Sequence, residues 1–167
     1  MTKPTTTPHI LAIYIASMAG EPMRNVVSAE VVPDGIKDDR YASGMGAYSK
    51  STPNKIRHIS LISTAGMTAA NEWLVAQGKP TFTAAQTRRN ILIDGISAED
   101  LNDLIGKEFR LGKILLKGVE LCDPCHRPAQ LVNKPDFINA FDNRGGLRAE
   151  IQSSGTISVG DCLNVNL

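Results

Sequence analysis

Short apolar runs broken by turn-forming residues are the main pattern along this chain. The runs are rich in Ile, Val and Leu and end near Gly, Pro, Asp or Asn, which is typical of β-strands. The pattern predicts strands at 10–16, 26–32, 56–62, 90–93, 109–111, 114–116, 149–152, 156–159 and 162–165. The junctions at 112–113 and 153–155 are typical of β-hairpins.

Helical segments are fewer, and the sequence predicts them at 65–77, 98–105 and 135–141. The first follows Ser63 and Thr64, either of which can cap it, and it stops at Gly78. The second follows Ser97, again a capping residue. Many short strands with two or three helices between them favour a β-rich barrel or α+β fold. The irregular order of strands and helices argues against a doubly wound parallel sheet.

Length and charge narrow the class of protein further. The 167 residues suffice for one domain with a real core, which we place at 10–167 after a Thr- and Pro-rich flexible tail at 1–9. A net charge of +1 argues against electrostatic binding to nucleic acid or to a membrane surface. The apolar run at 10–16 is too short to span a bilayer. Three cysteines do not form a secreted disulfide framework, so we expect a reducing, cytoplasmic location.

The segment Leu121-Cys122-Asp123-Pro124-Cys125-His126-Arg127 is the first place to look for chemistry. A thiol pair after a strand can bind a soft metal, carry sulfur or form a disulfide, and a neighbouring cation favours the thiolate. Structural zinc normally takes four ligands, and the sequence offers no second pair at the usual spacing. A thioredoxin-like motif needs a helix after the first cysteine, and Arg127-Pro128 predicts none. Cys162, in an apolar terminal run, is interpreted as a loop or core cysteine without a functional role.

Arginines beside glycines and strand ends form a second set of candidates. A guanidinium matches carboxylate and phosphate oxygens, so a convergent set would make an anion pocket. The set comprises Arg40, Arg88, Arg89, Arg127, Arg144 and Arg148. Gly145 and Gly146 lie between two of them and would let the backbone approach a ligand. Asp39 could orient Arg40 or a ligand hydroxyl, or it could stabilise the turn. The sequence contains neither a Walker loop for phosphate binding nor a dinucleotide-binding fingerprint.

These segments, in this order, resemble the MOSC domain, the C-terminal module of molybdenum cofactor sulfurases that also occurs as a stand-alone bacterial protein. The likeness extends over nearly all of 10–167 and rests on the following pieces: 20–23, the loop Gly35 to Tyr41, 57–62, Arg88-Arg89-Asn90-Ile91, the Cys125 segment, 144–149 and 155–161. The chain departs from the family at Asp38, where the loop usually has glycine.

The resemblance implies a mixed β-barrel that binds the molybdenum cofactor, a molybdopterin, or handles sulfur destined for it. The family's key cysteine matches Cys125, which would ligate molybdenum, with Cys122 as a second candidate ligand. Asp123 and His126 would be catalytic proton-transfer groups. The cofactor would be held by Asp39, Arg40, Arg88, Arg89, Asn90, Arg127, Arg144, Gly145, Gly146 and Arg148. Pyridoxal phosphate belongs to a separate domain of the sulfurases, and we expect none here.

Three functional hypotheses follow. The first is reduction of N-hydroxylated small molecules at a cysteine-ligated molybdenum, with electrons from reductase partner proteins. The second is a non-enzymatic carrier in which Cys125 holds a persulfide or delivers cofactor. The third is a zinc- or disulfide-stabilised barrel that binds an unrelated anion.

Overall fold

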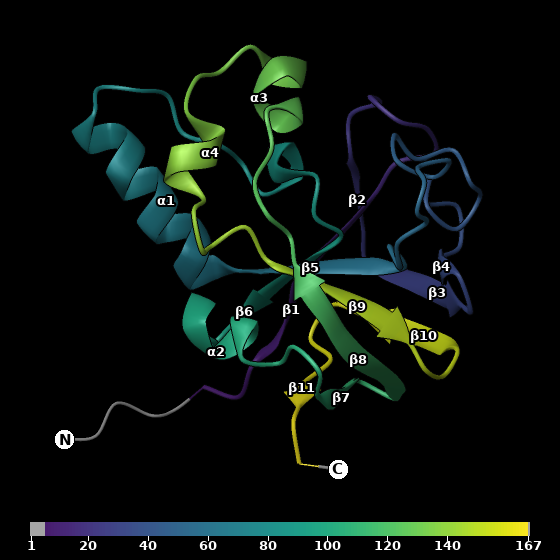
Figure 1. Cartoon of the computed structure of the whole chain (residues 1–167). Helices are drawn as coiled ribbons and strands as arrows, with labels where there is room; N and C mark the ends of the chain where they lie inside the picture. The colour runs from purple at the N-terminus through teal and green to yellow at the C-terminus, as the bar shows by residue number, and fades with distance from the viewer. Residues whose placement is uncertain (1–5, 167) are drawn as a thin grey trace, which may run out of the picture.

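Eight strands form one curled sheet in the computed structural model, which describes residues 6–166 (Figure 1). Within this range the strand order is β11-β7-β8-β9-β5-β6-β1-β2, and the β5–β6 pair is parallel while the other pairs are antiparallel. The strands are β1 (His9–Ile15), β2 (Arg24–Val26), β5 (Ile59–Ser63), β6 (Ile91–Asp94), β7 (Glu108–Leu111), β8 (Ile114–Leu121), β9 (Leu147–Ile151) and β11 (Leu163–Asn164). Of the expected tail, residues 1–5 lie outside the described range, and β1 already begins at His9.

The curled sheet closes where its first and last strands meet. His9 of β1 forms an antiparallel bridge with Cys162, directly before β11. The Ile10 N–H donates to the Asp161 carbonyl at 2.9 Å, and the Leu163 N–H donates to the Pro8 carbonyl at 2.8 Å. A small second sheet has the order β10-β3-β4, with β3 at Ser28–Val32, β4 at Gly35–Ile36 and β10 at Gly155–Ser158. The β-rich, barrel-like architecture expected from the sequence is confirmed.

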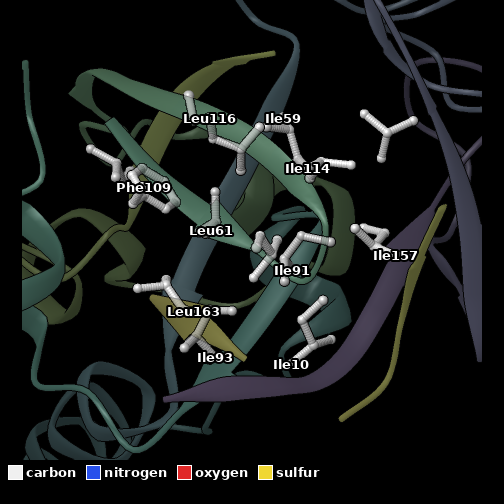
Figure 2. Packing of buried hydrophobic residues seen from close by; sticks show 14 of the residues in the cluster. Ile10, Ile59, Leu61, Ile91, Ile93, Phe109, Ile114, Leu116, Ile157 and Leu163 are labelled. Atoms are coloured by element: carbon white, nitrogen blue, oxygen red, sulfur yellow. The ribbon is translucent and has the colours of Figure 1, made fainter. Parts of the chain in front are cut away.

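Aliphatic side chains fill the inside of the curled sheet (Figure 2). Ile10, Leu61 and Ile91 come from β1, β5 and β6 and are fully buried. Phe109 of β7 and Ile157 of β10 join the same cluster, so the small sheet covers part of this core. Removing this apolar surface from water is the main force that holds the two sheets together.

The helices lie outside the curled sheet. They are α1 (Thr64–Ala76), α2 (Ala98–Asn102), α3 (Arg127–Val132), α4 (Phe137–Ala140) and a 3₁₀ turn, η1 (Ala85–Thr87). The Ser63 hydroxyl caps α1 by accepting from the Gly66 N–H at 2.9 Å, as the sequence predicted. In Figure 1, α1 and α4 lie side by side. Phe82, Phe137 and Phe141 pack with α1 in a second apolar cluster, with the Phe137 and Phe141 ring centroids 4.5 Å apart.

Helix α3 corrects one expectation from the sequence. Arg127-Pro128 had indicated that no helix follows the cysteines, yet α3 begins at Arg127. Pro128 occupies the first turn, where a helix needs no backbone N–H donor and where the fixed φ of proline is favourable. Cys125 therefore lies in the short connection between β8 and a helix. The described helices number four, more than the two or three expected.

Two strand predictions were also incomplete, and both errors concern strands that change sheets. The segment 26–32 is interrupted at Val27, which is 79% exposed, with β2 in the large sheet and β3 in the small one. The expected hairpin at 149–159 is wrong, because β9 stays in the large sheet while β10 pairs with β3. None of the helices formed by residues 6–166 is both long enough and apolar enough to cross a membrane.

Candidate functional site

A pocket of about 670 Å³, including its open mouth, lies where the connections that precede β5 and β6 meet the one that follows β8. Among the described residues, six arginines and one carboxylate line this pocket. The excess of positive charge favours the binding of anions. The lining residues are Ala19, Arg40, Tyr41, Ala47, Tyr48, Arg57, Ile59, Ser60, Arg88, Arg89, Asn90, Cys122, Asp123, Cys125, Arg127, Pro128 and Arg148.

The two thiols of the central segment have different environments. Cys122 is 2% exposed, its N–H donates to the Gly146 carbonyl at 2.8 Å, and burial raises the pKa of its thiol. Cys125 is half-buried in the pocket, and both residues are free thiols. The Tyr48 hydroxyl lies 4.0 Å from the Cys125 sulfur. Cys125 is therefore the thiol available to a ligand, while Cys122 is held as a neutral core residue.

Arg89 clamps the cysteine segment to the chain around it. Its guanidinium donates to the carbonyls of Gly145 at 2.6 Å, Thr87 at 3.2 Å and Cys122 at 3.4 Å. A Cβ on Gly145 would come within 2.3 Å of the Cys122 carbonyl oxygen, and one on Gly146, at φ +99°, within 2.1 Å of the Leu61 carbonyl oxygen. These glycines thus permit close backbone packing within the protein. The three hydrogen bonds of Arg89 hold the same backbone segments together.

A buried ion pair anchors the loop after β4. The Asp39 carboxylate is fully buried and accepts from Arg40 at 3.0 Å and from the Ala16 N–H at 3.1 Å. Arg40 also donates to the Arg88 carbonyl at 3.3 Å. Asp38, the departure from the family loop, has φ +69°, the left-handed conformation that glycine favours and that Asp tolerates better than most residues. Asp38 therefore adopts a backbone conformation that is open to glycine.

Asn90 and Arg148 are likewise occupied by protein contacts. The Asn90 side chain is 3% exposed, accepts from the Ser60 N–H at 3.2 Å and donates to the Tyr14 carbonyl at 3.1 Å. Arg148 donates to Glu120 at 2.6 Å. Burial alone would raise the pKa of Glu120, but the hydrogen bond and charge of Arg148, with other nearby cations, bring it below its usual range.

Guanidinium nitrogens with no acceptor among residues 6–166 come above all from Arg57, Arg88 and Arg127. Among residues 6–166, Arg57 and Arg127 form no side-chain hydrogen bond or ion pair within the protein, and the Arg57 Nε is buried without an acceptor. Arg88 donates from Nη1 to the Glu21 carbonyl, and its Nη2 is buried without an acceptor. Burial, together with the charges of Arg40 and Arg127, lowers the pKa of Arg88 to about 10, so it stays charged at neutral pH. Such unpaired buried donors are rare and costly in folded proteins. An anionic ligand would satisfy them.

The structure separates the remaining sequence candidates. Asp123 lines the pocket and is exposed, whereas His126 is exposed and lines a different depression beside α4. Gly145 and Gly146 line a small neighbouring cleft with Cys122, and Arg144 lines neither pocket. In the described part of the chain no three His, Cys, Asp or Glu side chains cluster as a metal site. A metal in this pocket would thus depend on Cys125 and on donors brought by a ligand.

Tyr41, Tyr48, Arg57 and Ser60 line the pocket but were not among the sequence candidates. The Arg57 guanidinium lies 4.8 Å from the centre of the Tyr48 ring, and that of Arg40 lies 4.9 Å from the Tyr41 ring. The charge of Cys125, then burial, raises the pKa of Tyr48. Arg57 lies two residues before β5, as Arg89 lies two residues before β6, whereas the sequence had placed Arg57 inside the expected strand at 56–62.

Comparison with known families identifies the fold. The model of the MOSC domain matches residues 50–164, more than half of the chain. The chain belongs to the MOSC domain family. The match spans β5 to β11, the cysteine segment and five of the six pocket arginines, whereas β1 to β4, Arg40 and Tyr48 lie before it.

Solved structures agree on the fold. The YuaD protein of Bacillus subtilis is similar with a TM-score of 0.74 and 18% identity, over 95% of this MOSC chain and 94% of YuaD. YiiM of Geobacillus stearothermophilus has a TM-score of 0.70 and 17% identity, over 96% and 75% of the two chains. YiiM of Escherichia coli has a TM-score of 0.64 and 15% identity, over 95% and 69%. Comparison with curated protein sequences gave no match.

Proposed function

We propose that this MOSC protein binds the molybdenum cofactor in the arginine-rich pocket and reduces N-hydroxylated small molecules there. The observation that carries the proposal is the position of Cys125, a half-buried free thiol in a pocket lined by six arginines. A soft thiolate suits a thiophilic metal, and guanidinium groups suit the phosphate of a pterin cofactor. Membership in the MOSC family, which is associated with this cofactor, supports the same proposal.

The donors in the pocket fit such a cofactor. Arg88 has a buried nitrogen without an acceptor, and Arg127 forms no side-chain hydrogen bond or ion pair with residues 6–166. These two residues would hold the anionic part of the cofactor, and Cys125 would be its protein ligand to the metal. Arg40, Arg89, Asn90 and Arg148 are occupied by the protein, so their role would be to shape the pocket and to add charge.

A side chain of this protein would transfer the protons that the reaction consumes. The bound cofactor supplies oxygen-atom transfer at the metal, which removes the substrate's N-bound oxygen as water and consumes an electron pair and a pair of protons. Asp123, exposed in the pocket lining, is placed to pass protons from solvent to that oxygen. The electrons would come from a reductase partner protein. The free thiols suit the reducing cytoplasm, where we propose that the protein acts.

Elemental analysis of the purified protein tests this proposal. Protein from a cofactor-producing host should contain near-stoichiometric molybdenum, and Cys125→Ala should lose both the metal and N-hydroxy reductase activity. Cys162→Ala is the matched control, because Cys162 is an exposed thiol outside the pocket. Metal and activity that survive in Cys125→Ala would refute the assignment of Cys125.

A sulfur-carrier role is the second candidate, and the contact between Tyr48 and Cys125 favours it. The Tyr48 hydroxyl, 4.0 Å from the sulfur, could donate to a persulfide anion, and Arg127 lines the same pocket. Intact mass after sulfur loading distinguishes this role, since a persulfide adds one sulfur atom to Cys125. A chain that takes up no sulfur and contains molybdenum would exclude the carrier role.

A further inference from the structure

A second cavity adjoins the cysteine pocket, and the two share Tyr41 and Arg57 in their walls. The turn between β3 and β4, the loop after β4 and the residues before β5 form this cavity. Its lining consists of Asp34, Tyr41, Ala42, Ser43, Gly44, Ser49, Asn54, Lys55, Arg57 and His58. Hydrogen-bond donors predominate, and Asp34 is the one carboxylate among these residues.

His58 is fixed as a donor by a backbone contact. Its Nδ1 atom accepts from the Ile151 N–H at 3.1 Å, so Nδ1 carries no proton. In the neutral ring the proton is then on Nε2, which makes that nitrogen a donor. His58 is among the residues that line the cavity, so Nε2 would be the atom that donates to a ligand there.

Arg57, the neighbour of His58, carries a charge that forms no ion pair with residues 6–166, although it lies near enough to Glu120 to help lower the pKa of that carboxyl. No carboxylate of residues 6–166 pairs with Arg57, and its buried Nε lacks an acceptor. Lys55 adds a second cation, although it is 3.6 Å from Glu120. A guanidinium with no ion-pair partner, beside an imidazole donor, matches a planar or tetrahedral oxyanion.

We infer that Arg57 and His58 form an anion subsite that binds a carboxylate or phosphate group of the substrate. Tyr48 connects this subsite with Cys125. Its ring lies against the Arg57 guanidinium, and its hydroxyl lies 4.0 Å from the Cys125 sulfur. A substrate bound across the shared wall would hold its acidic group at Arg57 and direct its N-hydroxyl group towards Cys125. This substrate class, acidic N-hydroxy compounds, rests on the proposed function, whereas the anion subsite itself does not.

Imidazole NMR on the full chain tests the subsite directly. The chain has three histidines, so His58 can be followed beside His9 and His126 as internal references. The probes are inorganic phosphate and acetate, added separately. The His58 ring signals should shift saturably with at least one probe while those of His9 stay in place, and the stronger probe identifies phosphate or carboxylate as the preferred group.

Variants localise the binding. Arg57→Gln should weaken the response of His58 at least about tenfold, the loss expected for a hydrogen bond to a charged group. The matched control is Arg110→Gln, the same substitution on β7, where Arg110 contacts the Lys113 carbonyl instead. Asn54→Ala, at an exposed lining residue, serves as a second variant and should weaken binding less.

Two results would overturn the inference. One is a His58 signal that does not move at phosphate and acetate concentrations that shift the backbone amide of Arg127. The other is an equal shift in the unmodified chain and in Arg57→Gln. Neither result depends on molybdenum, so failure of this subsite is distinguishable from failure of the proposed function, which the metal content of Cys125→Ala decides.

Discussion

The buried Asp39–Arg40 pair should be essential to the stability of the site loop. We consider Asp39→Asn, which keeps the side-chain volume and one acceptor oxygen but removes the charge. Asp39 is fully buried and Arg40 is 6% exposed, so the substitution leaves a guanidinium in the interior without its counter-charge. Breaking a buried pair in this way costs about 3–5 kcal/mol. The total stability of a domain is only about 5–15 kcal/mol, so the loss is a large part of it.

Urea unfolding followed by circular dichroism measures this loss. With a slope of about 2 kcal/mol per molar urea, the midpoint should fall by about 1.5–2.5 M. Glu30→Gln is the control, because Glu30 and Lys37 also form an ion pair at 3.3 Å but their side chains are more than half exposed. An exposed pair contributes about 0–1 kcal/mol, so this midpoint should hardly move. If Asp39→Asn shifted the midpoint no more than Glu30→Gln, the argument that burial makes the Asp39 pair essential would fail.

Two further predictions concern titration and thiol access. Because the pKa of Glu120 is lowered in the folded state, its contacts stabilise the protein at neutral pH, and this contribution is lost as pH falls through the folded pKa. Glu120→Gln should therefore lower the unfolding midpoint at pH 7, and this effect should shrink as the pH is lowered through the folded pKa; an effect that does not change with pH would contradict this. Under native conditions, alkylation followed by peptide mass spectrometry should modify the exposed Cys162 first, the half-buried Cys125 next, and Cys122 only on unfolding. Early modification of Cys122 would contradict its burial.

Local signals predicted most of the elements because those elements are stabilised locally. The cap at Ser63 and the glycine at 78 define α1 within a residue of the expected bounds, and the turn at 112–113 joins β7 and β8 as a hairpin. The errors arose where long-range pairing decided the outcome. Strand β10 begins after a turn that resembles a hairpin, yet it pairs with β3, more than a hundred residues away in sequence. No local pattern encodes that choice.

The candidate site shows the same division between local and spatial information. Arginines at strand ends indicated an anion pocket, and the structure brings Arg40, Arg88, Arg89, Arg127 and Arg148 to its walls. The sequence could not tell which of them have free donors, because that depends on backbone carbonyls from distant segments. Arg89 and Arg88 are adjacent, yet Arg89 binds three carbonyls while Arg88 keeps a nitrogen unpaired.

Arg57 was missed, although the topology explains why it belongs to this site. It precedes β5 as Arg88 and Arg89 precede β6, and β5 and β6 are parallel neighbours. The starts of two adjacent parallel strands lie at the same edge of a sheet, so side chains placed there converge. Recognising 56–62 and 90–93 as a parallel pair joined by the helix at 65–77 would have placed Arg57 in the pocket. Charged residues before successive strands of a βαβ unit are therefore better judged as one cluster than as separate surface positions.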